Sequence, residues 1–138
     1  MRMSKLKGKC ACGSAAAELD ESDVRMGFHC FCKDCQKLTG GGKSSNLLVD
    51  RDEIALSGRL VRHRMVGESG RERTHLCCEK CGSSIAVMNE SSRDCILRAG
   101  IFDDASGIAF ISIFTRSANP WDLPQTEIQF EGPAPDPD

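Results

Sequence analysis

Apolar residues recur along this chain in short alternating or β-branched stretches, which leaves room for only a turn or two of helix. Such stretches predict β-strands, because alternate residues of a strand point to opposite faces of a sheet. The strands expected on this basis cover residues 45–49, 53–56, 60–66, 84–88, 95–99 and 108–114.

Turn-forming residues separate these stretches at positions 40–42, 57–58, 67–70 and 89–92. Spacings this short suit hairpins better than strand–helix–strand units. Helix is expected only at residues 34–39 and 103–106, each too short to bury a helical face of its own. The pattern therefore predicts an all-β fold, or at least a mainly β one.

The length of 138 residues, 40% of them hydrophobic, is that of one compact domain with a single core. We expect that domain at residues 1–131 and a disordered, proline-rich tail at residues 132–138. Residues 1–8 lack the apolar run of a secretory signal, and no run of about eighteen apolar residues could span a bilayer. A cytoplasmic protein with no membrane partner is expected.

The net charge of -2 gives no electrostatic footprint for a nucleic-acid partner. Five arginines do gather in mid-chain, namely Arg59, Arg62, Arg64, Arg71 and Arg73. Glu68 and Glu72 dilute this group, which suits the outer face of a solvated hairpin better than a patch for an anionic small molecule. We therefore expect no nucleic acid to bind.

Nine cysteines dominate the chemistry, and most of them fall into three tight clusters. These clusters are Cys10-Ala-Cys12, Cys30-Phe-Cys32-Lys-Asp-Cys35 and Cys77-Cys78-Glu-Lys-Cys81. Two thiolates separated by one or two residues can reach one tetrahedral ion from a single turn, at about 2.3 Å. An odd number of cysteines also fits poorly with complete disulfide pairing, so zinc is favoured over a disulfide framework.

The first and third clusters together offer four thiolates, from Cys10, Cys12, Cys78 and Cys81. Four thiolates make a closed structural zinc site, which would staple the N-terminal strand to the middle of the chain. Cys78 is favoured over Cys77 as the ligand, because Cys78, Cys81 and Gly82 give the usual two-residue knuckle in which glycine accepts the positive φ after the last ligand. Cys77 and Cys95 are then expected to be small buried hydrophobic residues.

The middle cluster supplies three sulfurs within six residues, from Cys30, Cys32 and Cys35. Three protein ligands leave one coordination position open, which is typical of a catalytic zinc. The alternatives are an empty thiol cluster or a closed site completed by His29, His63, His75 or Cys95. Three thiolates largely cancel the charge of zinc, which favours binding of a thiol as thiolate over hydrolysis. The expected substrate therefore carries sulfur.

The cysteine motifs resemble those of the glutathione-dependent formaldehyde-activating enzyme family, which includes the centromere protein V type. The resemblance covers roughly residues 8–131, and its three signatures occur in the family's order. These signatures are residues 8–13, 30–40 and 78–83, with later segments at residues 98–104 and 114–121. The resemblance implies a β-tent of small antiparallel sheets stapled by zinc, with the second, catalytic zinc on the middle cluster.

The resemblance further implies a carbon–sulfur lyase that reversibly joins glutathione, or a similar thiol, to formaldehyde to give S-hydroxymethylglutathione. Two zinc ions would be its cofactors, with Cys30, Cys32 and Cys35 holding the catalytic one. Two other functions stay open: a noncatalytic zinc module that binds a partner protein, and a redox sensor that releases zinc on oxidation. No motif indicates an oligomeric state.

Two arginines and a histidine have both a functional and a simpler interpretation. Arg98 and Arg116 could pair with a carboxylate of glutathione, although surface positions at strand ends are the more usual interpretation. His29 could carry a proton near the zinc, but a strand histidine with no catalytic task is favoured.

The segment after the middle cluster offers further candidates. Lys37 and Thr39 could border the substrate, although a solvated turn is favoured. Residues 40–44 resemble the end of a phosphate-binding loop, but Lys37 stands where its first glycine would be, so a flexible loop beside the zinc is expected. Trp121, the one tryptophan, is expected to pack against the core rather than to line the substrate cleft.

Overall fold

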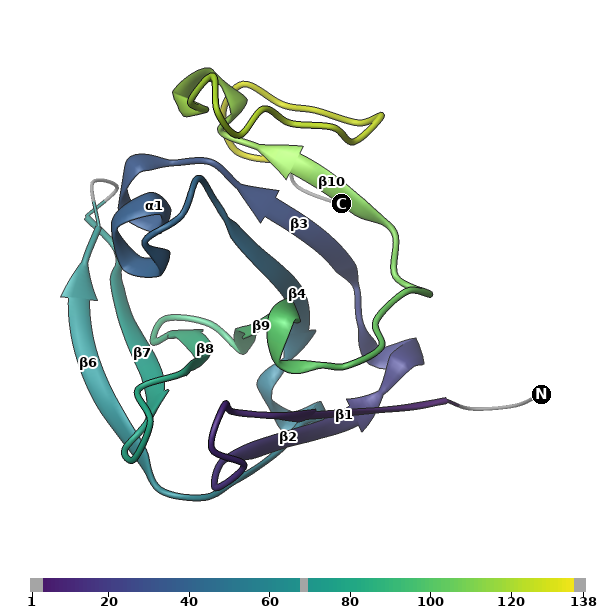
Figure 1. The fold of residues 1–138 in the computed structure, drawn as a ribbon, viewed down its shortest axis with the longest axis vertical. Helices are drawn as coiled ribbons and strands as arrows, with labels where there is room; N and C mark the ends of the chain where they lie inside the picture. The colour runs from purple at the N-terminus through teal and green to yellow at the C-terminus, as the bar shows by residue number, and fades with distance from the viewer. Residues whose placement is uncertain (1–3, 68–69, 136–138) are drawn as a thin grey trace.

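Two β-sheets carry the fold of this computed structural model within the residues that it describes, 4–67 and 70–135 (Figure 1). The smaller sheet has the strand order β1 (Lys5–Lys9), β2 (Ala16–Asp20) and β5 (Ala55–Ser57). The larger sheet has the order β10 (Phe110–Ile113), β3 (Met26–Cys30), β4 (Ser44–Asp50), β9 (Asp94–Arg98), β8 (Ser84–Asn89), β7 (Glu72–Cys78) and β6 (Leu60–Val66). The predicted mainly β fold is confirmed.

All six predicted strands are present, and each begins and ends within two residues of its expected bounds. The pattern missed β1, β2, β3 and β7. In β1 the inward positions hold only Leu6 and Gly8, so the strand offers a single apolar side chain to recognise. The alternation of buried and exposed positions in β1 becomes visible only once the burial of these two residues is known.

Helical segments are short. They are α1 (Lys33–Thr39) and the 3-10 turns η1 (Glu21–Asp23), η2 (Arg51–Glu53), η3 (Ala99–Ile101) and η4 (Thr115–Ser117). The predicted helix at residues 34–39 is confirmed as α1, but the one at residues 103–106 is wrong. There, Asp104 Oδ1 accepts hydrogen bonds from the Ser106 backbone N–H and hydroxyl, at 3.0 and 2.6 Å, which forms a turn in place of helical bonds.

Among the described residues, no helix is long and apolar enough to cross a membrane.

The larger sheet curls from β6 at one edge to β10 at the other, and α1 lies near its rim beside the start of β4 (Figure 1). Its strand pairs are antiparallel except β3 with β10, which is parallel. The expectation of small antiparallel sheets therefore needs a correction for this sheet. After β3 the chain builds the remaining strands before it returns to the free edge of β3, and so long a connection permits parallel pairing.

The hydrophobic core combines side chains of both sheets. Leu6 and Leu19 of the smaller sheet belong to the same buried cluster as Leu47, Leu76 and Leu97 of the larger one. The two sheets are thus held together by a shared core.

A row of polar side chains lies on one face of β3, β4 and β9. In the strand register Cys30 is opposite Ser44, and Asn46 is opposite Arg98. Cross-strand partners share a face, and so do residues two apart on one strand, so these four side chains line the same surface. His29 lies opposite Ser45 and therefore on the other face.

The hairpin of β6 and β7 forms one edge of the larger sheet. Arg62 and Arg64 on β6 are exposed, and Arg64 Nε lies 3.7 Å from a carboxylate oxygen of Glu72. This is the solvated hairpin that the arginine cluster predicts.

The segment after β10 folds back along that strand. Ser112 and Ile128 share a backbone hydrogen bond of 3.0 Å, and the Phe114 N–H donates to the Gly132 carbonyl at 2.9 Å. A single domain ending at residue 131, with a disordered tail at residues 132–138, stays a prediction, because residues 136–138 lie outside the described part of the chain.

Candidate metal centres

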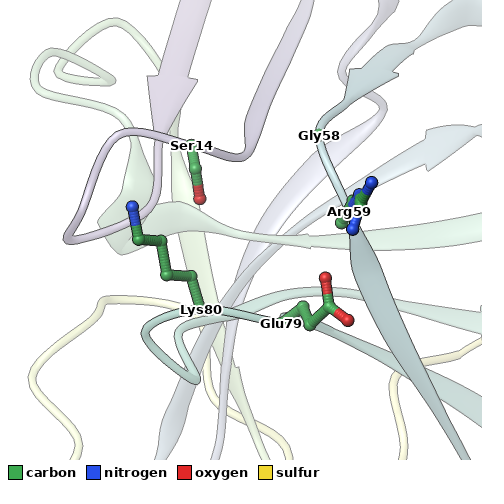
Figure 2. A pocket seen from close by; sticks show the side chains of 5 residues that line it. All are labelled: Ser14, Gly58, Arg59, Glu79 and Lys80. Atoms are coloured by element: carbon green, nitrogen blue, oxygen red, sulfur yellow. The ribbon is translucent and has the colours of Figure 1, made fainter.

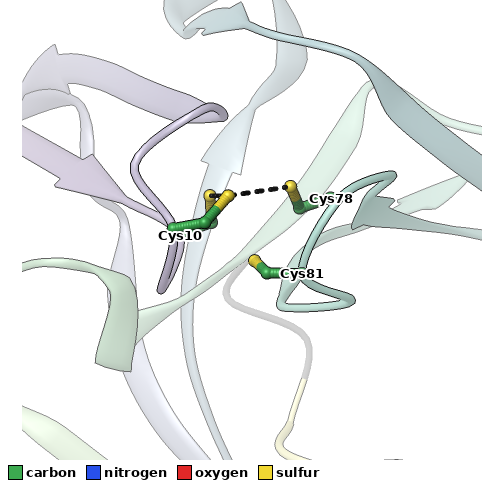
Figure 3. A group of neighbouring side chains, drawn as sticks. Cys10, Cys78 and Cys81 are labelled. Carbon is green, nitrogen blue, oxygen red and sulfur yellow. Dashed lines mark hydrogen bonds between the residues drawn. The ribbon is translucent and has the colours of Figure 1, made fainter.

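The four-cysteine cluster joins a turn of the smaller sheet to a turn of the larger one. Cys10 and Cys12 lie in the β1–β2 turn, whereas Cys78 ends β7 and Cys81 lies in the turn before β8 (Figure 3). The four Sγ atoms lie within 4.8 Å of one another, with Cys10–Cys12 at 3.6 Å and Cys12–Cys78 at 3.8 Å. Ligands about 2.3 Å from a tetrahedral zinc are about 3.8 Å apart, so this donor set fits the ion.

The turns of this cluster direct backbone N–H groups at the sulfurs. The Ala15 N–H donates to Cys10 Sγ at 3.2 Å and lowers the pKa of Cys10 to about 7. The hydroxyl and backbone N–H of Ser83 lower the pKa of Cys81 to about 5. Gly82 has φ +79°, as predicted for the residue after the last ligand. The local geometry thus favours the thiolate form of Cys10 and Cys81, the form in which cysteine binds metals.

A shallow pocket of about 480 Å³ adjoins the four-cysteine cluster, lined by Ser14, Gly58, Arg59, Glu79 and Lys80 (Figure 2). The Ser14 hydroxyl lies 3.0 Å from Cys12 Sγ and 3.2 Å from Cys78 Sγ. The pocket therefore belongs to the surroundings of the closed cluster and offers no substrate cavity to the three-cysteine one.

The three-cysteine cluster lies where β3 passes into α1. Cys30 is the last residue of β3, Cys32 caps the N-terminus of α1, and Cys35 lies in its first turn. The Cys35 N–H donates to Cys32 Sγ at 3.3 Å, and the three sulfurs lie within 4.8 Å of one another. Cys30 is buried and the other two are half-buried. One side of the cluster therefore stays accessible.

No fourth ligand completes this cluster among the described residues, where no other histidine, cysteine or carboxylate ligand atom lies within 4.8 Å of all three sulfurs. The closing ligands considered from the sequence, His29, His63, His75 and Cys95, therefore do not join it. The structure thus brings together the three predicted sulfurs, and no further protein ligand joins them within the described residues.

The three thiols interact strongly with one another. Hydrogen bonds from Cys30 and Cys35 hold the pKa of Cys32 well below its usual range. The pKa of Cys30 is raised, first by its hydrogen bond with Cys32, then by its hydrogen bond with Cys35 and by burial. The directions of these pKa shifts favour Cys32 as the first of the three thiols to ionise.

The C-terminal segment, which is the part of the chain that follows β10, contacts α1 and the loop after it, next to this cluster. Gln36 Nε2 donates to the Phe31 and Ser117 carbonyls at 2.8 and 3.0 Å, and Asn119 Nδ2 donates to Gln36 Oε1 at 2.8 Å. At the other end of α1, the Lys43 ammonium lies 2.8 Å from both carboxylate oxygens of Asp122. The predicted loop at residues 40–44 is thus tied to the C-terminal segment, contrary to the flexible loop expected there.

Two predicted site residues lie where the simpler interpretation put them. His29 Nδ1 is 2.8 Å from the Ser45 hydroxyl, and its ring stacks on Phe110 with centroids 4.7 Å apart, on the face away from Cys30. Arg116 is exposed, with its guanidinium 5.9 Å from the Phe114 ring centroid. Neither of them takes part in the three-cysteine cluster.

Of the other candidates, some lie as predicted and one does not. Lys37 and Thr39 are exposed in the last turn of α1, as a solvated turn predicts. Trp121 is 69% exposed, so the expected packing against the core is wrong; its neighbour Asp122 makes the inward contact instead, to Lys43. Cys95 is fully buried, as predicted, and burial raises its pKa to about 12.

Two further expectations are corrected. Cys77 is only half-buried, at a β-bulge between Leu76 and Cys77 that breaks the regular register. Arg98 is 9% exposed and lies in the sheet interior, so the surface position considered for it is wrong. Sequence reasoning also missed Ser44 and Asn46, although polar residues at two alternate positions of an otherwise apolar strand are a signal that it could have used.

Fold and clusters together define a small, mainly β protein with two cysteine clusters able to hold metal ions, one closed and one open. The sequence profile described as glutathione-dependent formaldehyde-activating enzyme matches residues 5–117, and the chain belongs to this family. A crystal structure of a Rhodobacter sphaeroides protein is similar in fold, with a TM-score of 0.55 and 17% identity over 90% of this chain and 98% of that chain. None of the curated proteins matches the chain.

Proposed function

We propose that this chain is a zinc-dependent carbon–sulfur lyase that condenses a thiol, such as glutathione, with formaldehyde to S-hydroxymethylglutathione, and also runs the reverse reaction. The observation that carries the proposal is the three-cysteine cluster, whose sulfurs lie within 4.8 Å of one another without a fourth ligand in the described part of the chain. Membership of the family adds support at the level of the reaction class.

The two clusters divide the metal-binding work in this proposal. Cys10, Cys12, Cys78 and Cys81 hold a structural zinc ion, and Cys30, Cys32 and Cys35 hold the catalytic one. A zinc ion bound at the three-cysteine cluster would lower the pKa of an incoming thiol, so that the thiol is ionised at neutral pH. A free thiol, with a pKa of about 8.5, is mostly protonated there.

The reaction forms one carbon–sulfur bond between the thiol sulfur and the aldehyde carbon. The carbonyl π electrons move to oxygen, and the proton lost by the thiol ends on that oxygen, so no oxidant or reductant is needed. The chain's part is to hold the thiol in place: Cys30 is fixed by β3, Cys32 and Cys35 by α1, and Gln36 keeps α1 against the C-terminal segment. Nine free cysteines suit a reducing compartment, so we place the protein in the cytoplasm as part of this proposal.

The test is exchange NMR of glutathione with formaldehyde, which reports the rate of interconversion between the free thiol and its hydroxymethyl adduct. We expect the zinc-loaded protein to accelerate this exchange and the Cys32→Ala variant to return it to the uncatalysed rate. Cys95→Ala is the matched control, because Cys95 is a buried cysteine outside both clusters and its replacement should leave the rate unchanged. Native protein that leaves the uncatalysed rate unaltered would refute the lyase and favour a module that binds a partner protein.

A further inference from the structure

A buried arginine lies behind the three-cysteine cluster. Arg98 is 9% exposed, its Nη1 donates to Asn46 Oδ1 at 2.8 Å, and its Nε donates to Ser84 Oγ at 2.9 Å. In the described part of the chain no carboxylate oxygen lies within 4.0 Å of the guanidinium. A buried cation without an anionic partner is costly, so the compensating charge must come from another group.

The cysteines are the groups that can supply this charge. Burial lowers the pKa of Arg98, whereas the thiols of Cys35, Cys77 and Cys30 act in the opposite direction and raise it. Three thiolates around a divalent ion carry one net negative charge before substrate binds. A guanidinium beside such a centre would balance that charge one for one.

The hydrogen bonds from Arg98 lead through Asn46 and Ser44 toward the three-cysteine cluster. A guanidinium only donates, so the Asn46 oxygen must face Arg98 and the Asn46 amide N–H must face the other way. There, Asn46 Nδ2 donates to Ser44 Oγ at 2.8 Å. Because Ser44 Oγ accepts this bond, its own hydrogen is free to be donated toward the three-cysteine cluster, where the strand register places Ser44 directly opposite Cys30.

The strand register holds these groups in place. Asn46 on β4 is directly opposite Arg98 on β9, and Ser44, two residues earlier on β4, is opposite Cys30 on β3. Asn46 and Ser44 are at most 2% exposed, so water does not compete for these bonds. Donors behind a metal-binding thiolate fix its orientation and tune how strongly it binds the metal.

We propose that Arg98, Asn46 and Ser44 form a hydrogen-bond chain that positions the thiols of the three-cysteine cluster and would balance the charge of that centre when it holds a metal ion. Arg98 is then a positioning residue for metal binding, not a substrate ligand. The inference rests on the metal site of the proposed function but not on its reaction, and the two can fail separately.

The experiment is a Co²⁺ titration of the full chain, with competition by a chelator and with the sulfur-to-cobalt charge-transfer band as the spectroscopic readout. The Cys32→Ala variant gives the signal of the four-cysteine centre alone, so its difference from the native protein belongs to the three-cysteine centre. We expect Ser44→Ala to weaken Co²⁺ binding there about tenfold and to shift the charge-transfer band to lower energy, because the sulfur loses a donor.

The arginine variants separate charge from hydrogen-bond geometry. Arg98→Met should weaken Co²⁺ binding at the three-cysteine centre more than Ser44→Ala does, and Arg98→Lys, which keeps the charge but not the planar fork, should recover part of the loss. Arg116→Met is the matched control, because Arg116 is exposed and should leave both readouts unchanged. If Arg98→Met does not fold, Ser44→Ala, a smaller change, decides the matter.

Native affinity and an unshifted band in Ser44→Ala would overturn the proposal, and so would a native chain that binds only one Co²⁺ ion. A shifted band in a protein that fails to accelerate the exchange of glutathione with formaldehyde would leave the hydrogen-bond chain standing and refute the lyase.

Discussion

Single residues at the turns decide whether the cysteines can converge. Gly82 follows the last ligand of the four-cysteine cluster at φ +79°, and its N–H donates to the Cys78 carbonyl at 2.9 Å. A Cβ at this position would meet no atom within 4 Å, so the need for glycine comes from the backbone conformation and not from crowding.

Gly82→Ala should lower the free energy of unfolding by about 1 kcal/mol, because a side chain destabilises the left-handed conformation. Gly100→Ala is the matched control: a Cβ there also meets no atom within 4 Å, but the backbone of Gly100 does not have this positive φ. Urea unfolding of both variants at saturating zinc measures the difference. Equal losses in the two variants would show that the backbone at residue 82 is not strained by alanine.

At the scale of elements, α1 depends on its surroundings. A helix of seven residues is too short to be stable by itself, and none of its residues is fully buried. Gln36 makes up for this, because its amide bonds to Phe31, Ser117 and Asn119 tie the helix to the strand before it and to the C-terminal segment. The position of Cys35 therefore depends on residues more than eighty positions further along the chain.

Gln36→Ala should lower the free energy of unfolding by about 1–2 kcal/mol, since it leaves the Phe31 and Ser117 carbonyls without this donor. It should also speed the loss of metal from the three-cysteine centre to a chelator. Lys37→Ala, the neighbouring exposed position on the same helix, should change neither quantity. Native rates of metal loss in Gln36→Ala would mean that α1 holds its cysteines without help from the C-terminal segment.

At the scale of the whole molecule, the two clusters differ in what they connect. The four-cysteine cluster joins the β1–β2 turn of the smaller sheet to the β7–β8 turn of the larger one, across more than sixty residues of sequence. The three-cysteine cluster lies within six consecutive residues. A metal ion bound at the first site would therefore restrain the arrangement of the sheets, whereas one bound at the second would restrain only a local turn.

Cys12→Ser should lower the free energy of unfolding by about 5 kcal/mol or more, a loss comparable to the whole stability of a small domain. Cys32→Ser should cost about 2 kcal/mol or less, because the remaining fold does not depend on that centre. Thermal unfolding followed by circular dichroism, with and without a zinc chelator, compares the two variants. A larger loss in Cys32→Ser than in Cys12→Ser would reverse the assignment of the closed cluster as the structural one.

Much of the grouping of the cysteines was predictable because it is local. The spacing of cysteines within each cluster, the glycine after the last ligand and the short alternating strands all depend on neighbours a few residues away. β1 escaped prediction because its alternation involves a single apolar side chain, Leu6. Trp121 was misplaced because the ion pair of Lys43 with Asp122 decides which side chain of that segment faces inward.

The sequence by itself thus determined the class of fold and the cysteine donors, since both follow from patterns within short segments. Only the tertiary structure decided which surfaces those donors share: the parallel pairing of β3 with β10, the burial of Arg98 and its bond to Asn46, 52 residues away in sequence. Strand register and burial result from contacts between distant segments, and a single pattern along the chain does not contain them.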